Sequence, residues 1–261
     1  MIGRSFPLYP GKHAFPAVTD PSEHTAYVQT QKADATLTDL AGVVLLYQRT
    51  ALRDAYAHYT VRPLEGWVRG HLGIIQLNDR SVGICGGFGP GAPAAGLILE
   101  QLLALGAQSV ITVGTAAALQ PDLRAGEIVV CTRALRDEGL SHHYLTPSRY
   151  VRPSIALSSA LLDTLATQGV RARAGAAWST DAPYRETEQE VAQYGAEGVL
   201  VADMEAAGVL AVAEHRGADA AAAFAVADSL VDRRPRHDAP HVRTALGSVL
   251  QAALAALRTA T

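Results

Sequence analysis

The sequence predicts one α/β domain, a three-layer α/β/α sandwich around a central mixed, mostly parallel sheet. Apolar stretches typical of strands alternate with helix-like stretches along the whole chain. The strand-like stretches lack polar alternation, as expected of strands buried on both faces. No linker, repeat or low-complexity segment divides the 261 residues. We therefore expect a single domain over residues 1–261, with an irregular N-terminal arm over about residues 1–40.

The composition argues against several partner classes. The formal net charge is −3 and the arginines are scattered, so we expect no binding to nucleic acid. No apolar run approaches the ~20 residues of a membrane span, and the N-terminus lacks the apolar core of a signal peptide. Cys85 and Cys131 fall in predicted buried strands, where packing residues are expected rather than a disulfide or metal site. We expect a cytoplasmic protein.

The first part of the chain leads from a polar arm into the sheet. Residues 1–40 carry prolines and little periodicity, so we expect an extended arm with a lead-in near residues 33–40. Elements expected next are a strand over Gly42–Tyr47, a helix over Thr50–Tyr59, a hairpin or bent strand over Trp67–Leu72 and Ile74–Leu77, and a turn at Asn78-Asp79.

The stretch over residues 81–119 predicts a ligand-binding site at one edge of the sheet. An apolar strand, Val82–Cys85, runs into a turn with four glycines, and a helix over Ala94–Gly106 leads to a second strand, Ser109–Val113. The small residues of GTAA follow this second strand as another loop. Ligands of open parallel sheets bind at such carboxyl ends. Tight packing alone is the alternative, and neither GxGxxG with a following acid nor GxxxxGK[ST] is present.

The remaining elements continue the alternation. The last helix is alanine-rich and amphipathic, and we expect it to pack on the sheet edge. Predicted strands are Ile128–Thr132, Ala174–Trp178, Val199–Ala202 and Ala220–Val226, and predicted helices are Ser158–Thr167, Glu186–Tyr194, Asp203–Gly217 and Pro240–Thr261.

Polar side chains follow three of these strands. Asp203 fits an ordinary helix cap as well as a site residue. Glu205 lies in a helix of Ala, Val, Leu and Gly, and a buried acid needs a partner; we favour a ligand with sugar hydroxyls. Asp228 is a general acid or a turn residue, and Thr115 follows the second central strand. His142 and His143 are site residues or surface residues.

Six motifs together resemble nucleoside phosphorylase family I, which includes purine nucleoside phosphorylases, uridine phosphorylases and related nucleosidases. The motifs are GPGAPAAG, VITVGTAAALQPDLRAGEIVV, RDEGLSHHY, STDAPYRET, VADMEAAGVLAV and AVADSLVD. The uridine-phosphorylase-like branch is the most similar, because RDEGLSHHY and TDAPYRET have close counterparts there. The resemblance covers roughly Val82 to Asp232.

This resemblance implies cleavage of an N-glycosidic bond with phosphate as co-substrate, no cofactor, and a homodimer or homohexamer. It implies that Met204 and Glu205 hold the ribose, that Gly114 and Thr115 touch phosphate and sugar, and that Asp228 protonates the leaving base. The predicted substrate-binding set is completed by Asp203, by Gly87 of the glycine-rich turn, by His143, and by Tyr184 stacking on the base.

The chain departs from the family pattern at the phosphate. Thr112 stands where the family has a phosphate-binding arginine, Ala227 stands where a serine precedes the aspartate, and the Pro-Gly-Asp-Pro loop is missing. Arg49, Arg53 or a neighbouring subunit are candidate replacements. In typical uridine phosphorylases a glutamine and an arginine bind the uracil. The residues ETEQ at Glu186–Gln189 do not match this pair, which favours a purine-like base. Phosphorolysis is therefore the first hypothesis, hydrolysis with water the second, and a non-catalytic nucleoside-binding protein the third.

Overall fold

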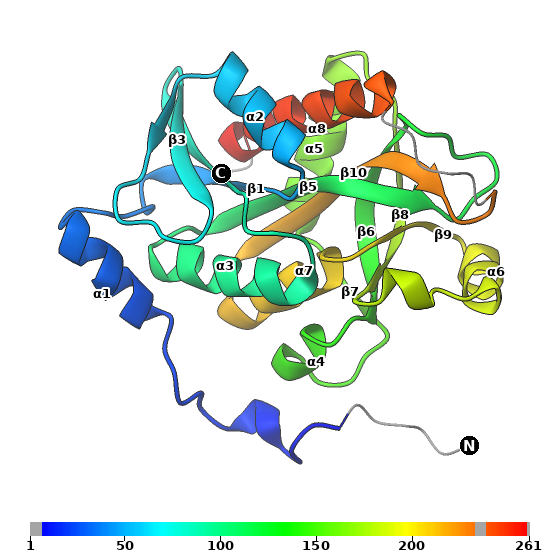
Figure 1. Cartoon of the computed structure of the whole chain (residues 1–261), viewed down its shortest axis with the longest axis horizontal. Helices are drawn as coiled ribbons and strands as arrows, with labels where there is room; N and C mark the ends of the chain where they lie inside the picture. Colours follow the sequence, from blue (N-terminus) through cyan, green and yellow to red (C-terminus); the bar gives the residue numbers. More distant parts are fainter. Residues whose placement is uncertain (1–6, 233–238, 260–261) are drawn as a thin grey trace.

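The computed structural model describes residues 7–232 and 239–259, and it has one sheet with helices on both faces (Figure 1). The strands are β1 (Leu40–Leu46), β2 (Val61–Pro63), β3 (His71–Leu77), β4 (Arg80–Gly86), β5 (Ser109–Ala118), β6 (Ile128–Asp137), β7 (Tyr150–Val151), β8 (Ala172–Thr180), β9 (Val199–Asp203) and β10 (Asp219–Ser229). The helices are η1 (Lys12–Ala14), α1 (Ser22–Gln31), α2 (Arg49–His58), α3 (Ala92–Ala104), α4 (Ser141–Tyr144), α5 (Ile155–Thr167), η2 (Pro183–Arg185), α6 (Glu188–Ala196), α7 (Ala206–Arg216) and α8 (Pro240–Thr259).

The sheet consists of two parallel blocks joined by antiparallel pairs. Strands β4, β1, β5 and β10 form one parallel block, and β6, β8 and β9 form the other. The antiparallel pairs β10–β6 and β5–β9 connect the blocks, so that β5, β10, β6, β8 and β9 close into a ring. This mixed sheet confirms the predicted fold class, and the ring brings the ends of β5, β9 and β10 close together.

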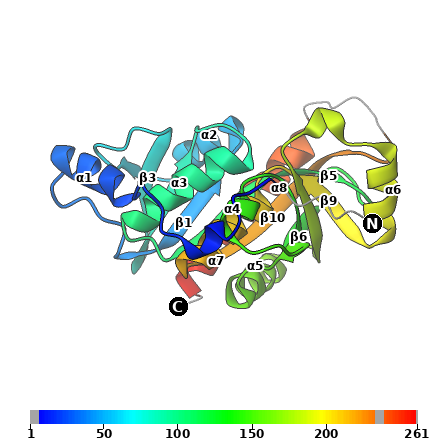
Figure 2. The same cartoon turned by 90° about the horizontal axis from the view of Figure 1, so that it is seen from below.

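Helices cover the two faces of the sheet in separate groups. Helix α8 lies with α5 and α2 over one face, and α3 and α7 pack side by side over the other (Figures 1 and 2). Strand β10 passes between α7 and α8, and its alanines at positions 220–223 are all buried. Because alanine side chains are short, both helices can approach this strand closely. The predicted layers are therefore present in the structure.

The arm contains a short 3-10 helix, η1, and an α-helix, α1, which the sequence did not predict. Helix α1 is polar on most sides and buries only Val28, so the periodic signal of an amphipathic helix is missing. The rest of the arm, residues 7–21, passes outside α3, α4 and α7 (Figure 2). Residues 1–6 of the predicted arm, and residues 260–261 of the predicted last helix, lie outside the described residues.

Two further expectations were wrong. The GTAA segment is not a loop, because β5 continues to Ala118 through pairing of Gly114 with Phe224 and of Thr115 with Ala225. Helix α8 does not lie on the sheet edge: its apolar side, including Leu250 and Leu254, packs across the middle of one face. The sequence did not reveal this continuation of β5, because small residues have weak strand propensity and pairing with β10 overrides that propensity.

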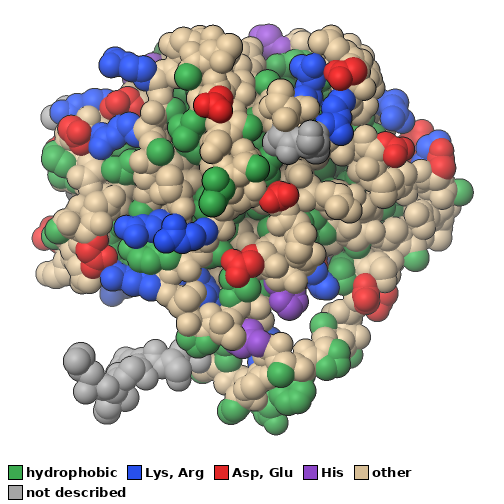
Figure 3. Space-filling model, turned by 180° about the vertical axis from the view of Figure 1, so that it is seen from behind, with side chains coloured by type: hydrophobic (Ala, Val, Ile, Leu, Met, Phe, Trp, Pro, Cys, Tyr) green, Lys and Arg blue, Asp and Glu red, His purple; other side chains and the backbone are tan. Residues whose placement is uncertain are grey.

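Charged groups on the surface are mixed in sign. On the face seen from behind in Figure 3, acidic and basic side chains alternate with apolar ones. Among residues 7–232 and 239–259, no helix combines the length and the apolar character that crossing a membrane requires.

Candidate active site

The acidic residues at the ends of β9 and β10 lie at one edge of the ring. In the sheet register Asp228 is opposite Ala117 of β5, and Ala117 is opposite Ala202 of β9. Two strand spacings therefore separate the α-carbons of Asp228 and Ala202, which is about 10 Å. Asp203 follows Ala202 as the last residue of β9, and Glu205 lies two positions further on. The register thus places both acid-bearing strand ends next to the same strand, β5.

Asp203 caps helix α7. It is 5% exposed, and its Oδ1 accepts a hydrogen bond of 2.5 Å from Ser179 Oγ. Its Oδ2 accepts from the backbone N–H of Glu205 at 2.9 Å and of Ala206 at 2.7 Å. Burial raises the pKa of Asp203 to about 6 despite these donors. These bonds hold Asp203 at the start of α7, and its contact with substrate remains a prediction.

Glu205 connects two loops of the edge. It stands at the start of α7 rather than within the helix, contrary to the expectation from sequence, and it is 6% exposed. Its Oε1 accepts a hydrogen bond of 2.7 Å from the Gly91 N–H, at the end of the glycine-rich turn. No ion pair between described residues includes it. Burial, and then the charge of Asp203, raise the pKa of Glu205 to about 8.

Tyr47 packs against Gly114 of β5, and the sequence analysis did not single it out. Its ring meets the Phe88 ring edge-on at 5.8 Å, and a Cβ at Gly114 would lie 3.1 Å from Tyr47 Cδ2. Burial, and then the charge of Glu205, raise the pKa of the Tyr47 phenol well above its usual value. One feature of the sequence could have pointed to Tyr47. It is an aromatic residue with a polar hydroxyl, and it stands at the end of the apolar run GVVLLY.

Thr115 is held by the loop that precedes α2. The Nε2 amide of Gln48 donates a hydrogen bond of 2.9 Å to Thr115 Oγ1. Arg49 follows Gln48 directly, and Arg53 lies one helical turn later; both side chains are exposed. Their role in binding phosphate remains a prediction.

Three other predicted residues lie at the same edge. Gly87 has φ +78°, and a Cβ there would lie 3.0 Å from His71 Cδ2, so this position favours glycine. Met204 is half-buried between Asp203 and Glu205. Asp228 is half-buried at the end of β10, and none of the described residues donates a hydrogen bond to its carboxylate. Their contacts with substrate remain predictions.

The RDEG segment organises the loop around α4. The Arg136 guanidinium is buried and donates to Ser141 Oγ at 2.9 Å and to Ser148 Oγ at 2.7 Å. Glu138 accepts from the Ser141 N–H at 3.0 Å, and Asp181 accepts from the Gly139 N–H at 2.7 Å. The residues of this motif therefore hold one loop in place beside the edge of the sheet.

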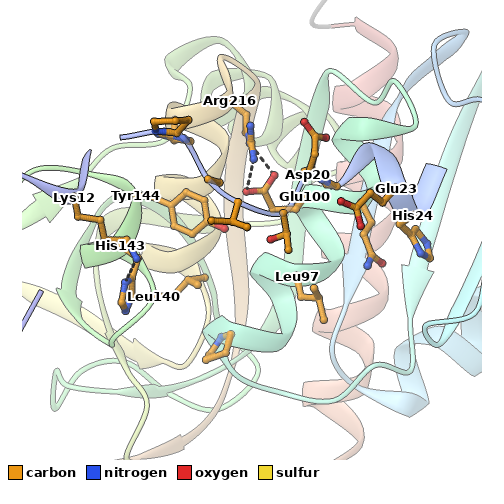
Figure 4. Close-up of a pocket in the computed structure, with 18 of the residues that line it drawn as sticks. Lys12, Asp20, Glu23, His24, Leu97, Glu100, Leu140, His143, Tyr144 and Arg216 are labelled. Atoms are coloured by element: carbon orange, nitrogen blue, oxygen red, sulfur yellow. Dashed lines mark hydrogen bonds and ion pairs between the residues drawn. The ribbon is translucent and has the colours of Figure 1, made fainter. Parts of the chain in front are cut away.

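His143 and Tyr184 are placed differently from the other predicted residues. His143 lines a cavity of about 1020 Å³ between the arm and helices α3, α4 and α7, where its Nδ1 is 2.8 Å from Lys12 Nζ (Figure 4). The same cavity exposes the ion pair of Arg216 with Glu100 (Figure 4). The Tyr184 ring is 99% exposed, so the described residues do not form a stacking pocket around it. Their contacts with substrate remain predictions.

Known proteins resemble the chain over most of this fold. The model of the phosphorylase superfamily matches residues 55–259. A guanosine phosphorylase from Halorubrum lacusprofundi is 32% identical over 55% of this chain and 59% of its own length. A DeoD-type purine nucleoside phosphorylase from Caldanaerobacter subterraneus is 29% identical, covering 56% and 63%, and a uridine phosphorylase from Haemophilus influenzae is 30% identical, covering 41% and 42%. The chain thus spans less than two thirds of the length of these curated relatives. The chain belongs to the phosphorylase superfamily.

Proposed function

We propose that this chain is a nucleoside phosphorylase, which cleaves the N-glycosidic bond of a nucleoside with phosphate to give a free base and a pentose 1-phosphate. The observation that carries the proposal is Glu205: a buried acid at the sheet edge, fixed by the Gly91 N–H and without an ion pair among described residues. Relatives named as guanosine, purine nucleoside and uridine phosphorylases support it.

Cleavage of the N-glycosidic bond requires two acids in different roles. When the C1′–N bond breaks, positive charge develops on the ribose ring and negative charge on the base. Glu205 accepts hydrogen bonds from the ribose hydroxyls and stabilises the cationic sugar, with Met204 against the ring. Asp228 gives a proton to the leaving base, and such general acid catalysis contributes roughly 10²–10⁴-fold.

Phosphate binds, in this proposal, at Gly114 and Thr115, with Arg49 or Arg53 supplying positive charge. Both arginines lie on α2, whose preceding residue Gln48 already contacts Thr115. The base is purine-like, phosphate is the only co-substrate, and no cofactor takes part. A homodimer or homohexamer and a cytoplasmic location complete the proposal.

The experiment that tests this proposal is a panel of purine and pyrimidine nucleosides incubated with the purified chain, with and without phosphate. Chromatography follows the released base, and a sugar-phosphate assay follows pentose 1-phosphate. We expect phosphate to increase base release and purine nucleosides to react fastest. Binding without any base release would instead identify a non-catalytic nucleoside-binding protein.

A further inference from the structure

Two polar contacts tie the N-terminal arm to helix α4. The Lys12 ammonium nitrogen lies 2.8 Å from Nδ1 of His143, and His13 Nε2 donates a hydrogen bond of 2.9 Å to the carbonyl of His142. Figure 4 shows the contact of Lys12 with His143 at one end of the cavity beneath the arm. Lys12 and His13 belong to η1, whereas His142 and His143 belong to α4. These contacts therefore hold η1 in place on α4.

Apolar packing adds little to this docking. Helix η1 buries none of its residues, and the nearby side chains of Tyr9, Phe15 and Val18 are 75%, 62% and 101% exposed. A cavity of about 1020 Å³ lies between the arm and helices α3 and α7. Because the arm removes little apolar surface from water here, the polar contacts decide whether η1 stays on α4.

The contact between Lys12 and His143 exists in only one protonation state of the imidazole. An ammonium group has three donors and no acceptor, so Nδ1 of His143 must accept with a lone pair. A proton on Nδ1 removes that lone pair and places a second positive charge 2.8 Å from the first. Protonation of His143 thus turns an attraction into a repulsion.

The groups around His143 add to this repulsion. Burial, and then the positive charges of Lys12, His142 and His13, lower the pKa of His143 below its ordinary value of 6.5. No ion pair between described residues includes Lys12. Elsewhere along the cavity, Arg216 of α7 is paired with Glu100 of α3, and the remaining titratable side chains include Asp20, Glu23, His24, Arg69, Tyr144 and His215. The charges that act most on His143 are therefore all positive.

We propose that the N-terminal arm is a pH-sensitive strap, docked on α4 while His143 is neutral and released from α4 when His143 gains a proton. The docked arm favours the neutral imidazole, so release occurs as the pH falls through the range below about 6.5. Release uncovers the part of the cavity wall formed by Leu97 and Leu140, while α1 keeps its separate contact with α3. The device does not depend on the reaction proposed above.

The test measures the distance between the arm and the body of the full chain. Cys85 and Cys131 are buried, so a fluorescent donor and acceptor attach to exposed cysteines introduced by Phe15→Cys and Ile155→Cys. Resonance energy transfer is recorded from about pH 8 to about pH 5, over the range in which circular dichroism shows an intact fold. We expect the ratio of released to docked arm to rise roughly tenfold, the factor that two unit charges at this distance produce even in bulk water.

Two variants and one control assign the response to the contact. His143→Asn keeps an acceptor near the position of Nδ1 but cannot titrate, so its arm should stay docked throughout. Lys12→Met removes the second charge, and its ratio of released to docked arm should change less than about twofold with pH. His58→Asn is the matched control: His58 Nδ1 also makes a short contact, 2.7 Å from the Asp54 carbonyl, and this variant should respond like the labelled parent chain. A distance in the parent chain that is independent of pH overturns the proposal, and so does a parental response in His143→Asn or Lys12→Met.

Discussion

The Gly91 N–H donates a hydrogen bond of 2.7 Å to Glu205 Oε1, across 114 positions of sequence. The donor ends the glycine-rich turn after β4, and the acceptor begins α7 after β9. This bond holds the carboxyl group of Glu205, which is buried and lies near the like charge of Asp203. The predictions below follow from how Glu205 and its neighbours are held.

Gly91→Ala tests this bond. Gly91 has φ +103°, a conformation that disfavours a side chain, so alanine should shift the turn and weaken the contact with Glu205. We expect kcat/KM for nucleoside to fall roughly tenfold. Gly89→Ala is the matched control, because Gly89 has a similar φ of +95° and open space around its Cβ position. Equal losses in both variants would attribute the effect to turn strain alone.

Stability should depend on pH through Glu205. Its pKa is about 8 in the folded chain against an ordinary value of 4.5, so the folded state holds the proton more tightly. The stabilisation by this proton is fully present below pH 4.5 and is lost as the pH rises towards 8. Glu205→Gln mimics the protonated acid, and its unfolding midpoint should therefore exceed that of the wild type at pH 9 and approach it at pH 5. Parallel curves from urea denaturation across this range would contradict the assignment.

Asp203→Ala tests the cap of α7. The substitution leaves the N–H groups of Glu205 and Ala206 and the hydroxyl of Ser179 without their acceptor. A loss of about 1–3 kcal/mol in the free energy of unfolding is expected. The comparison is Asp122→Ala, which removes only an exposed ion pair with Arg173 and should cost less than about 1 kcal/mol. Chemical denaturation measures both, and equal effects would argue against the cap.

Arginines on α2 should govern the use of phosphate. Arg49→Ala and Arg53→Ala remove the positive charges closest in sequence to Gln48, which holds Thr115. At least one of these variants should raise the KM for phosphate roughly tenfold while the KM for nucleoside changes little. Arg171→Ala removes an exposed charge elsewhere and serves as the control. If both α2 variants retain the wild-type KM for phosphate, the charge comes from another residue.

The sequence predicted the order of elements well, because buried strands such as β1 and β10 are long apolar runs that are easily recognised as strands. It failed where pairing or docking decides the structure. Helix α1 lacks an apolar stripe, the small residues after Gly114 extend β5 only because β10 pairs with them, and α8 finds its face through contacts distant in sequence. Helical periodicity carries no information on such contacts.

Like the fold, the site could be predicted only in part, because some of its contacts join residues that are distant in sequence. Glu205 was identified as a buried acid because its surroundings are apolar in sequence, and the structure confirms that it is buried. The hydrogen bonds of Asp203 and the packing of Tyr47 against Gly114 depend on atoms from other strands, which no local pattern encodes. His143 was predicted from a motif, whereas the docking of Lys12 from the arm against it could not be predicted, because the two residues are far apart in sequence.

The most direct test of the account is the turnover of Glu205→Gln and Asp228→Asn, measured as base release from a purine nucleoside in saturating phosphate, beside the unfolding midpoint of each variant. The account predicts that kcat falls at least about 100-fold in each while both proteins remain folded at the assay temperature. Turnover within about twofold of the wild type in either folded variant would contradict the role given to that acid.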